Sequence, residues 1–432
     1  MGSKFPVDWE VQPLEHSLAA LIDYRGRSPR KVSRGIPLIT AKIVKGGRIL
    51  QPEEFIAEDD YDAWMRRGIP HAGDVLVTTE APLGEVSQLD GRKVALAQRL
   101  IALRGKVDIL DNRFLKFAML SQFVQDQLRA RATGTTVHGV RQSALRKINL
   151  QIPPIAEQRA IAEHLGKIDD AIELNLRMNA TLEEIFRALF QFWFVDFGPA
   201  RAKIEGHWKQ GESFPGAPAD SWDLWPDSLV DSEMGEIPKG SEAGVLGELC
   251  RFSRDTVAPD SVDPSLPYVG LEHMQPRNLT VPMPGKIGEV KTAKTKFDVG
   301  DVLFGRLRPY FHKVAVACEP GFCSTTIAVA RPVKEDWRGV LIGYMDNDAF
   351  VDYAVARSNG TTMPAVSSHE MAGYPLVIPQ AALARRFTEF TRPFLLSMKA
   401  NCLQTRTLTA VGNTLLPKLL SGEIRIPLNG GR

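Results

Sequence analysis

Two short loops carry paired hydroxyl side chains in nearly the same local sequence. Gly134-Thr135-Thr136 reappears 226 positions later as Gly360-Thr361-Thr362. A threonine hydroxyl becomes a nucleophile beside a general base, and no histidine–carboxylate pair accompanies both copies. The hydroxyls could instead give and accept hydrogen bonds from a flexible backbone. The plainer alternative is that glycine and threonine only form a turn between a helix and a strand.

Positive charge is concentrated in two stretches of the first copy. The whole chain has 53 Lys and Arg against 51 Asp and Glu, so a net charge of +2 gives no global attraction to nucleic acid or membrane. Residues 25–48 and 129–147 nevertheless contain many Lys and Arg and no acid, whereas residues 220–242 are strongly acidic. The basic stretches are candidate phosphate contacts, although each could be only a solvated face.

The sequence lacks the motifs of catalysis and cofactor binding. It has no Gly-x4-Gly-Lys-Ser/Thr loop for nucleotide phosphates, and the Asp-Phe-Gly triplet at 196–198 lacks the other kinase segments. The four cysteines fit neither a disulfide framework nor a zinc site, even with His312 close to Cys318 and Cys323. We therefore expect no catalysis by this chain alone, no cofactor and no metal.

The N-terminal residues do not have the apolar core of a signal peptide. No run approaches the roughly 18 apolar residues that a membrane span needs. Free thiols are typical of a reducing compartment. We therefore expect a cytoplasmic protein.

The repeat extends beyond the two loops. The Gly-Asp-Val-Leu at 73–76 matches 300–303, and the Ile-Pro at 152–153 matches 378–379. This period is far longer than a solenoid unit, which indicates a duplicated domain. In each copy the pattern predicts short strands, then a helix at 112–130 or 340–357, and then the threonine loop, which is a mixed α/β order.

A long helix follows each copy. Apolar positions from Ile161 to Trp193 alternate in steps of four and three, and the pattern continues 226 positions later, so we predict an antiparallel coiled coil within the chain. Pro393 predicts a kink or a late start of the second helix. Asn175 and Asn401 hold equivalent seam positions and could fix the register as paired buried amides, or both could face solvent.

The predicted fold is mixed α/β, with two globular domains separated by two long antiparallel helices and related by a pseudo-twofold repeat. Proline, glycine and acidic residues make residues 199–243 a linker, in which Trp208, Trp222 and Trp225 follow no period. The predicted boundaries are 1–152 for the first domain, 153–198 for the first long helix, 199–243 for the linker, 244–378 for the second domain, 379–424 for the second long helix and 425–432 for the tail.

Four segments make the chain resemble the specificity subunits of type I restriction–modification systems. They are residues 152–165 (IPPIAEQRAIAEHL), 182–197 (LEEIFRALFQFWFVDF), 231–239 (DSEMGEIPK) and 415–424 (LLPKLLSGEI). The resemblance implies two target-recognition domains, each reading half of a split site on double-stranded DNA. It also implies two helices that separate these domains and dock methyltransferase (modification) subunits, with restriction subunits joining the larger assembly. Residues 382–385 depart from it, because Ala-Leu-Ala-Arg replaces the Glu-Gln of the first helix start.

Given this resemblance, the cations and the loop side chains become candidate DNA contacts, since cations suit phosphates and short polar groups suit base edges. The segment 306–313 adds aromatic residues between basic ones. The candidates are Lys42, Lys45, Arg48, Thr135, Thr136, His138, Arg141, Arg306, Arg308, Tyr310, Lys313, Thr361, Thr362 and Ser367.

Two other functions fit the same pattern. The first is a scaffold with two protein-binding heads on a helical rod, which salt-dependent binding to one split DNA sequence would exclude. The second is a stand-alone DNA-binding regulator, which would keep its specific binding without a methyltransferase partner.

Overall fold

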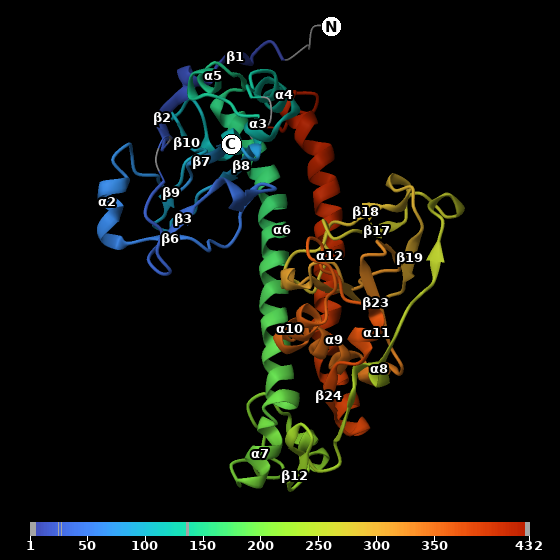
Figure 1. The fold of residues 1–432 in the computed structure, drawn as a ribbon. Helices are drawn as coiled ribbons and strands as arrows, with labels where there is room; N and C mark the ends of the chain where they lie inside the picture. The colour runs from blue at the N-terminus through green and yellow to red at the C-terminus, as the bar shows by residue number, and fades with distance from the viewer. Residues whose placement is uncertain (1–5, 25, 27, 135–137, 428–432) are drawn as a thin grey trace. The chain divides into compact units, whose positions relative to one another are not determined.

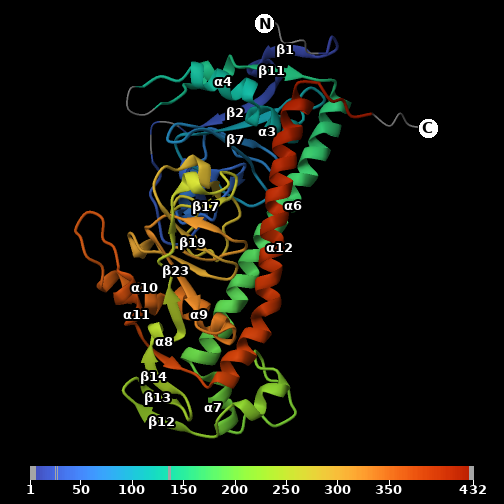
Figure 2. The same cartoon turned by 90° about the vertical axis from the view of Figure 1, so that its right-hand side faces the viewer.

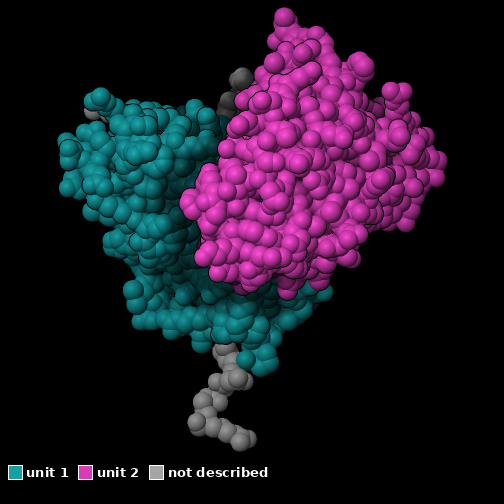
Figure 3. All heavy atoms as spheres, turned by 90° about the horizontal axis from the view of Figure 1, so that it is seen from below, with its two compact units in different colours: residues 1–171, 408–432 teal, residues 172–407 magenta. Residues whose placement is uncertain are grey.

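A computed structural model describes residues 6–24, 26, 28–134 and 138–427. The chain forms two compact units, residues 1–171 with 408–432, and residues 172–407, coloured separately in Figure 3. Each unit holds one copy of the repeat and part of both long helices (Figure 1).

The first unit is built on a four-stranded antiparallel sheet. Its strands, in spatial order, are β2 (Leu18–Asp23), β10 (Leu100–Gly105), β7 (Val75–Thr79) and β8 (Leu83–Gln88). Successive side chains of a strand point to opposite faces, so Val75 and Val77 enter one apolar core and Leu76 enters another. The sheet is therefore covered on both faces.

Smaller elements complete the first unit. The strands are β1 (Glu10–Pro13), paired with β11 (Asn149–Ile152); β3 (Ile36–Ile39), between β6 (Phe55–Ile56) and the parallel β9 (Ala95–Leu96); and the hairpin β4 (Val44–Lys45) with β5 (Arg48–Ile49). The helices are α1 (Leu14–Ser17), α2 (Tyr61–Trp64), α3 (Asn112–Leu120), α4 (Gln122–Ala130) and α5 (Gln142–Arg146). The single helix predicted at 112–130 is wrong, because Ser121 is extended and caps α4 with its Oγ.

The second unit repeats this architecture. Its four-stranded sheet is β15 (Cys250–Phe252), β23 (Ile327–Pro332), β20 (Val302–Gly305) and β21 (Val314–Val316). The second sheet is larger, with β16 (Thr256–Val257), β19 (Lys294–Phe297), β22 (Gly321–Cys323), β17 (Pro267–Val269) and β18 (Gly285–Lys286). The remaining strand pairs are β14 (Glu242–Val245) with β24 (Pro375–Ile378), and β12 (Leu229–Ser232) with β13 (Gly235–Pro238). The helices are α8 (Leu246–Leu249), α9 (Arg338–Asp346), α10 (Asp348–Ala356) and α11 (Ser368–Ala372).

A buried ion pair occupies the same place in both units. Arg104 donates Nε and Nη2 to the Asp74 carboxylate at 2.7 Å each, and Arg331 donates the same atoms to Asp301 at 2.9 and 2.7 Å. The two aspartate side chains are only 1% and 3% exposed. The two Gly-Asp segments noticed in the sequence are therefore structurally equivalent.

The long helices are α6 (Ile155–Phe190), extended by a π turn at Gln191–Val195, and α12 (Ala381–Leu420). Within each unit, stretches of α6 and α12 lie side by side (Figures 1 and 2). The predicted late start of α12 is wrong, because this helix continues unbroken through Pro393. Among the described residues, no helix is long and apolar enough to cross a membrane.

Asn175 and Asn401 are buried in the seam between these helices, as predicted, but they do not bond to each other. Asn401 donates Nδ2 to Oδ1 of Asn179 at 2.8 Å, and Asn175 donates Nδ2 to Oγ1 of Thr405 at 3.4 Å. Asn175 and Asn401 are 6% and 8% exposed. The predicted pairing of Asn175 with Asn401 is therefore wrong, because antiparallel helices place Asn179 opposite Asn401.

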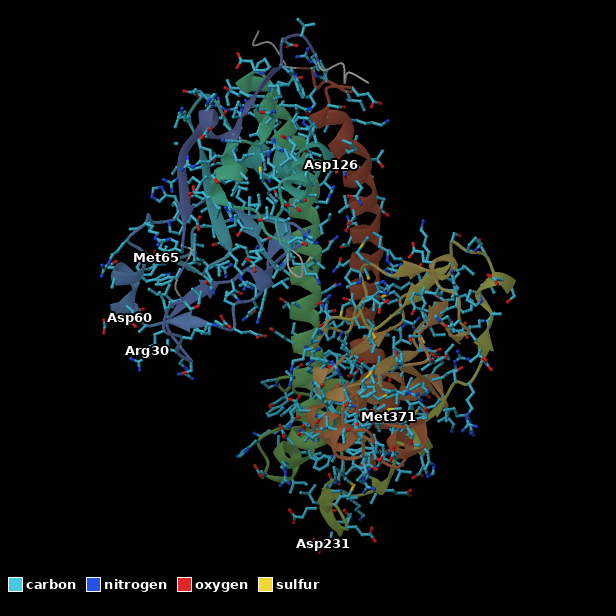
Figure 4. All side chains as sticks on the ribbon, turned by 45° about the horizontal axis from the view of Figure 1, so that its top comes forward. Arg30, Asp60, Met65, Asp126, Asp231 and Met371 are labelled. Carbon is cyan, nitrogen blue, oxygen red and sulfur yellow. The ribbon has the colours of Figure 1, made fainter. Side chains whose placement is uncertain are left out.

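Residues 199–243 are folded and do not form an extended linker. They contain α7 (Gly198–Ile204), a 3-10 turn at Ala219–Leu224 and the β12–β13 hairpin. The unperiodic tryptophans pack together, with ring centroids 5.1 Å apart for Trp208 and Trp222 and 5.0 Å apart for Trp193 and Trp225. Asp231, in the acidic part of this segment, is exposed (Figure 4).

One buried carboxyl on α6 makes stability depend on pH. The Glu183 side chain is 3% exposed, and burial raises its pKa from 4.5 to about 7 despite Arg187 at 3.6 Å. The folded protein therefore holds the Glu183 proton more tightly than the unfolded chain does, and this difference stabilises the fold fully below pH 4.5. The stabilisation is lost as the pH rises through about 7, because the carboxyl then ionises in the folded protein as well. Glu183→Gln should therefore raise the free energy of unfolding by about 1–3 kcal/mol at pH 8 and change it little at pH 5.

Urea unfolding of this variant at the two pH values measures the effect. The matched control is Glu184→Gln, which alters an exposed neighbour on the same helix. Equal changes at pH 5 and pH 8 would contradict the assignment.

Candidate nucleic-acid interface

Three segments meet at the end of β7 in the first unit. The Thr79 N–H donates to the Arg99 carbonyl at 2.9 Å, and the Val140 N–H donates to the Thr79 carbonyl at 2.9 Å. Thr133 and Gly139 exchange two backbone hydrogen bonds, of 2.8 and 2.9 Å, which close the base of the threonine loop. We call residues 79–80, 98–99 and 133–141 the first rim; Thr135 and Thr136 lie outside the described residues.

The same three segments meet at the end of β20 in the second unit. The Arg306 N–H donates to the Thr326 carbonyl at 2.9 Å, and the Val366 N–H donates to the Arg306 carbonyl at 3.2 Å. Asn359 and Ala365 close the base of the second loop with two bonds of 3.0 Å. Residues 306–308, 324–326 and 359–367 form the second rim. The two threonine loops are therefore equivalent, each fastened at its base to the end of a central strand.

The first rim encloses an open hollow of about 420 Å³. Its lining residues are Gly26, Thr79, Glu80, Gln98, Arg99, Thr133, Gly139, Val140 and Arg141. The hollow is polar and carries two exposed cations, Arg99 and Arg141, of which Arg99 lies 3.4 Å from Glu80. It therefore offers hydrogen-bonding groups and positive charge to a ligand.

The sequence prediction missed Glu80, Gln98 and Arg99 in this hollow. They follow β7 and β9, far in sequence from the threonine loop. The repeat could have indicated Arg99 as a site residue. Its position corresponds to Thr326 in the second copy, which lies in the polar segment 324–326.

The second rim presents Thr361 and Thr362 at an exposed loop tip. Arg306 and Arg308 are half-buried, and Nη2 of Arg308 donates to the Thr362 carbonyl at 3.4 Å. Arg308 therefore supports the loop backbone. Ser367 caps α11, because its Oγ accepts the Glu370 N–H at 3.1 Å, so this hydroxyl has a structural role.

The other predicted cations divide into exposed and internal ones. Lys42 and Lys45 are exposed near the β4–β5 hairpin, and His138 is exposed beside the first loop. Arg48 is half-buried and lies 3.5 Å from Asp169 on α6. Lys313 donates Nζ to the Leu271 carbonyl at 2.6 Å. The last two side chains hold the fold together, which makes them weaker candidates for DNA contact.

His312 also has an internal partner. It is buried, and its Nε2 lies 3.0 Å from the Asp346 carbonyl. It thus belongs to a contact with α9 and not to a group with the neighbouring cysteines. Arg30, from the basic stretch 25–48, is exposed (Figure 4).

Together these features define a protein with a duplicated α/β domain, in which each copy bonds the base of a threonine loop to the end of a central strand. Residues 26–184 match the family described as "Type I restriction modification DNA specificity domain". The chain is 23% identical to the type I restriction enzyme MjaIX specificity subunit of Methanocaldococcus jannaschii, over 98% of this chain and 95% of that protein. It is also 30% identical to the HindI specificity subunit of Haemophilus influenzae, over 26% of this chain and 24% of that protein.

A solved structure shares the fold. The S subunit of a type I restriction–modification system from M. genitalium superposes with a TM-score of 0.53 at 16% identity, over 97% of each chain. The matched domain and this similarity over nearly the whole chain confirm the resemblance to type I restriction–modification specificity subunits seen in the sequence.

Proposed function

We propose that this chain is the specificity subunit of a type I restriction–modification complex and reads a bipartite site on double-stranded DNA. The observation that carries the proposal is the pair of equivalent rims, built from the same three segments with matching backbone hydrogen bonds. Each rim combines arginines with short polar side chains, which suit phosphates and base edges respectively. One rim would read each half of the site.

The contacts would come from the exposed members of each rim. In the first unit we assign this role to Arg99, Arg141, His138 and the threonine loop, with Lys42 and Lys45 as phosphate contacts. In the second unit we assign it to the tip of the loop at Thr361 and Thr362, with Arg306 beside it. Asn175 and Asn401 would fix the register of the helix pair through their buried hydrogen bonds.

Catalysis would come from partner subunits docked on the long helices. In the second unit α6 exposes Leu174, Met178 and Ile185, which are 58%, 43% and 42% exposed and recur at steps of four and seven. On α12, Leu396 is 54% exposed. An apolar stripe of this kind marks a protein interaction site. We assign this stripe to the docking of the methyltransferase subunits. Restriction subunits would join the complex through them, and the complex would act in the cytoplasm.

Reconstitution tests this function. The purified chain with a methyl donor and DNA should modify nothing, and adding the cognate methyltransferase subunit should produce methylation at one bipartite sequence, mapped by sequencing. Methylation by the chain alone would contradict the non-catalytic role. A chain that binds no DNA in the complex would favour the protein-binding scaffold, and unchanged specific binding without the partner would favour the regulator.

The loop of the second rim should contribute to the recognition of only one half of the DNA site. Thr362→Ala removes a hydroxyl at the loop tip but keeps the carbonyl that Arg308 binds. We expect a loss of about 1–3 kcal/mol, roughly 5–150-fold in affinity, at that half-site alone. Binding to single-base variants of the mapped site measures it.

A capping variant provides the contrast. Ser367→Ala removes the N-cap of α11, so it should lower stability by about 1 kcal/mol and leave the base preference intact. If Thr362→Ala instead lowers the melting temperature and leaves both half-sites unchanged, the loop only forms a turn.

A further inference from the structure

Two aromatic rings stand exposed beside the second rim. Tyr310 and Phe311 are 52% and 44% exposed, and their ring centroids lie 4.8 Å apart. Both belong to a single 3-10 turn, Pro309–Phe311. Two adjacent exposed rings offer a ligand a flat apolar surface.

The turn is held in a strained backbone conformation. The residues on either side of it, Arg308 and His312, have φ angles of 51° and 48°, in the left-handed region that side chains disfavour. Such strain persists where the surroundings fix it and often marks a functional segment. Here the Arg308 N–H donates to the Pro364 carbonyl at 2.7 Å, which bonds the turn directly to the threonine loop.

The other end of the turn is anchored in the core of the second unit. His312 is 4% exposed and contacts the Asp346 carbonyl at 3.0 Å, while its Nδ1 lies 3.3 Å from Oδ1 of Asp348. Arg187 of α6 donates Nε to Asp346 at 2.6 Å. The base of the turn is therefore rigidly supported, and its two rings project from it.

The first unit has no equivalent ring pair. The matching residues follow β7, where Ala81 also has a positive φ, of 47°, and is also followed by a proline. The positions of Tyr310 and Phe311 correspond to Leu83 and Gly84. Both units thus have a positive φ before a proline at this point. Leu83 and Gly84 begin strand β8, however, whereas Tyr310 and Phe311 lie in a 3-10 turn, and only the second unit carries aromatic side chains here.

We propose that Tyr310 and Phe311 form a wedge that inserts at a base step in the second half-site, unstacks it and bends the duplex. The inference rests on the proposed function. Rigid apolar side chains beside arginines suit this task, because they enter the stack while the cations hold the phosphates. Pyrimidine–purine steps unstack most easily, so the second half-site should favour one of them at the wedge, without direct contacts to its bases.

The test uses the full complex of the chain with its methyltransferase subunit. The probe is a duplex with the site found by methylation mapping, in which 2-aminopurine replaces one adenine at a time. The methylated adenine stays unlabelled, because a methyltransferase extrudes its target base. Binding of the natural chain should raise the fluorescence at one step of the second half-site several-fold.

The double variant Tyr310→Ala with Phe311→Ala should lose that signal and bind about 10–100-fold more weakly, with an unchanged melting temperature. Tyr310→Phe keeps the ring and should keep the signal, and Met283→Ala, an exposed apolar residue outside the rim, serves as the matched control. An unchanged signal in the double variant overturns the wedge.

Two other results are equally informative. If the double variant fails to assemble with the methyltransferase subunit although the chain is stable, the rings are a protein contact, and the wedge is overturned. If the natural complex binds no bipartite site at all, the proposed function is overturned and the wedge with it.

Discussion

Lengthening both long helices by one heptad is expected to move the two half-sites apart and leave their sequences unchanged. The insertions belong between Ala171 and Ile172 of α6 and between Thr407 and Leu408 of α12, where the chain passes from one unit to the other. Seven residues keep the seam in phase and add about 10.5 Å of helix. At about 3.4 Å per base pair, this corresponds to roughly three more base pairs of spacer.

The expected loss at the original site is large. A complex that can no longer engage both halves at once should fall towards non-specific binding, a loss of about 10³-fold or more. Sequencing of methylated DNA from cells with the variant chain and its partner subunit measures the new spacer. Insertion into α6 alone is the control, because it puts α6 and α12 out of register on one side of the insertion and should destabilise the helix pair. An unchanged spacer after both insertions would show that the helices do not set it.

The second large effect should come from the ion pairs at the starts of β7 and β20, the strands whose other ends carry the rims. Arg104→Met leaves the Asp74 carboxylate, which is 1% exposed, without its bidentate partner. Breaking a buried pair in this way costs about 3–5 kcal/mol. Arg331→Met is the twin change in the second unit, where the arginine is 43% exposed and the cost should lie at the lower end.

The twin variants separate the two rims. Each arginine lies on a strand next to the one that carries its rim, so each variant should relax one half-site and leave the other unchanged. Hydrogen exchange should show the loss of protection within the same unit. Arg104→Met with Asp74→Asn should recover part of the stability, because it removes the unpaired charge as well. Equal damage at both half-sites would contradict this assignment.

Several parts of the fold followed from local patterns alone. The repeated Gly-Asp segments predicted duplicated domains, and the heptad steps from Ile161 to Trp193 predicted a paired helix. Both are periodic signals that need no knowledge of distant contacts. The errors arose where local signals compete. Pro393 is tolerated inside α12, and Ser121 divides one predicted helix into two because its side chain caps the second.

The candidate site was predicted less completely. Thr361 and Thr362 and the cations Lys42, Lys45 and Arg141 are exposed and remain predicted contacts, whereas Arg48 and Lys313 have partners within the fold. A long cationic side chain looks the same in a sequence whether it faces solvent or a buried oxygen.

The sequence by itself determined that this protein is duplicated, that each copy has a long helix after it, and which family it resembles, because repeats, periodicity and motifs can be recognised without knowledge of distant contacts. Only the tertiary structure decided that Asn179 is the partner of Asn401, that Arg99 joins the first rim, and that Tyr310 and Phe311 stand exposed beside the second. Each of these depends on the register between segments distant in the chain, and side-chain packing sets that register.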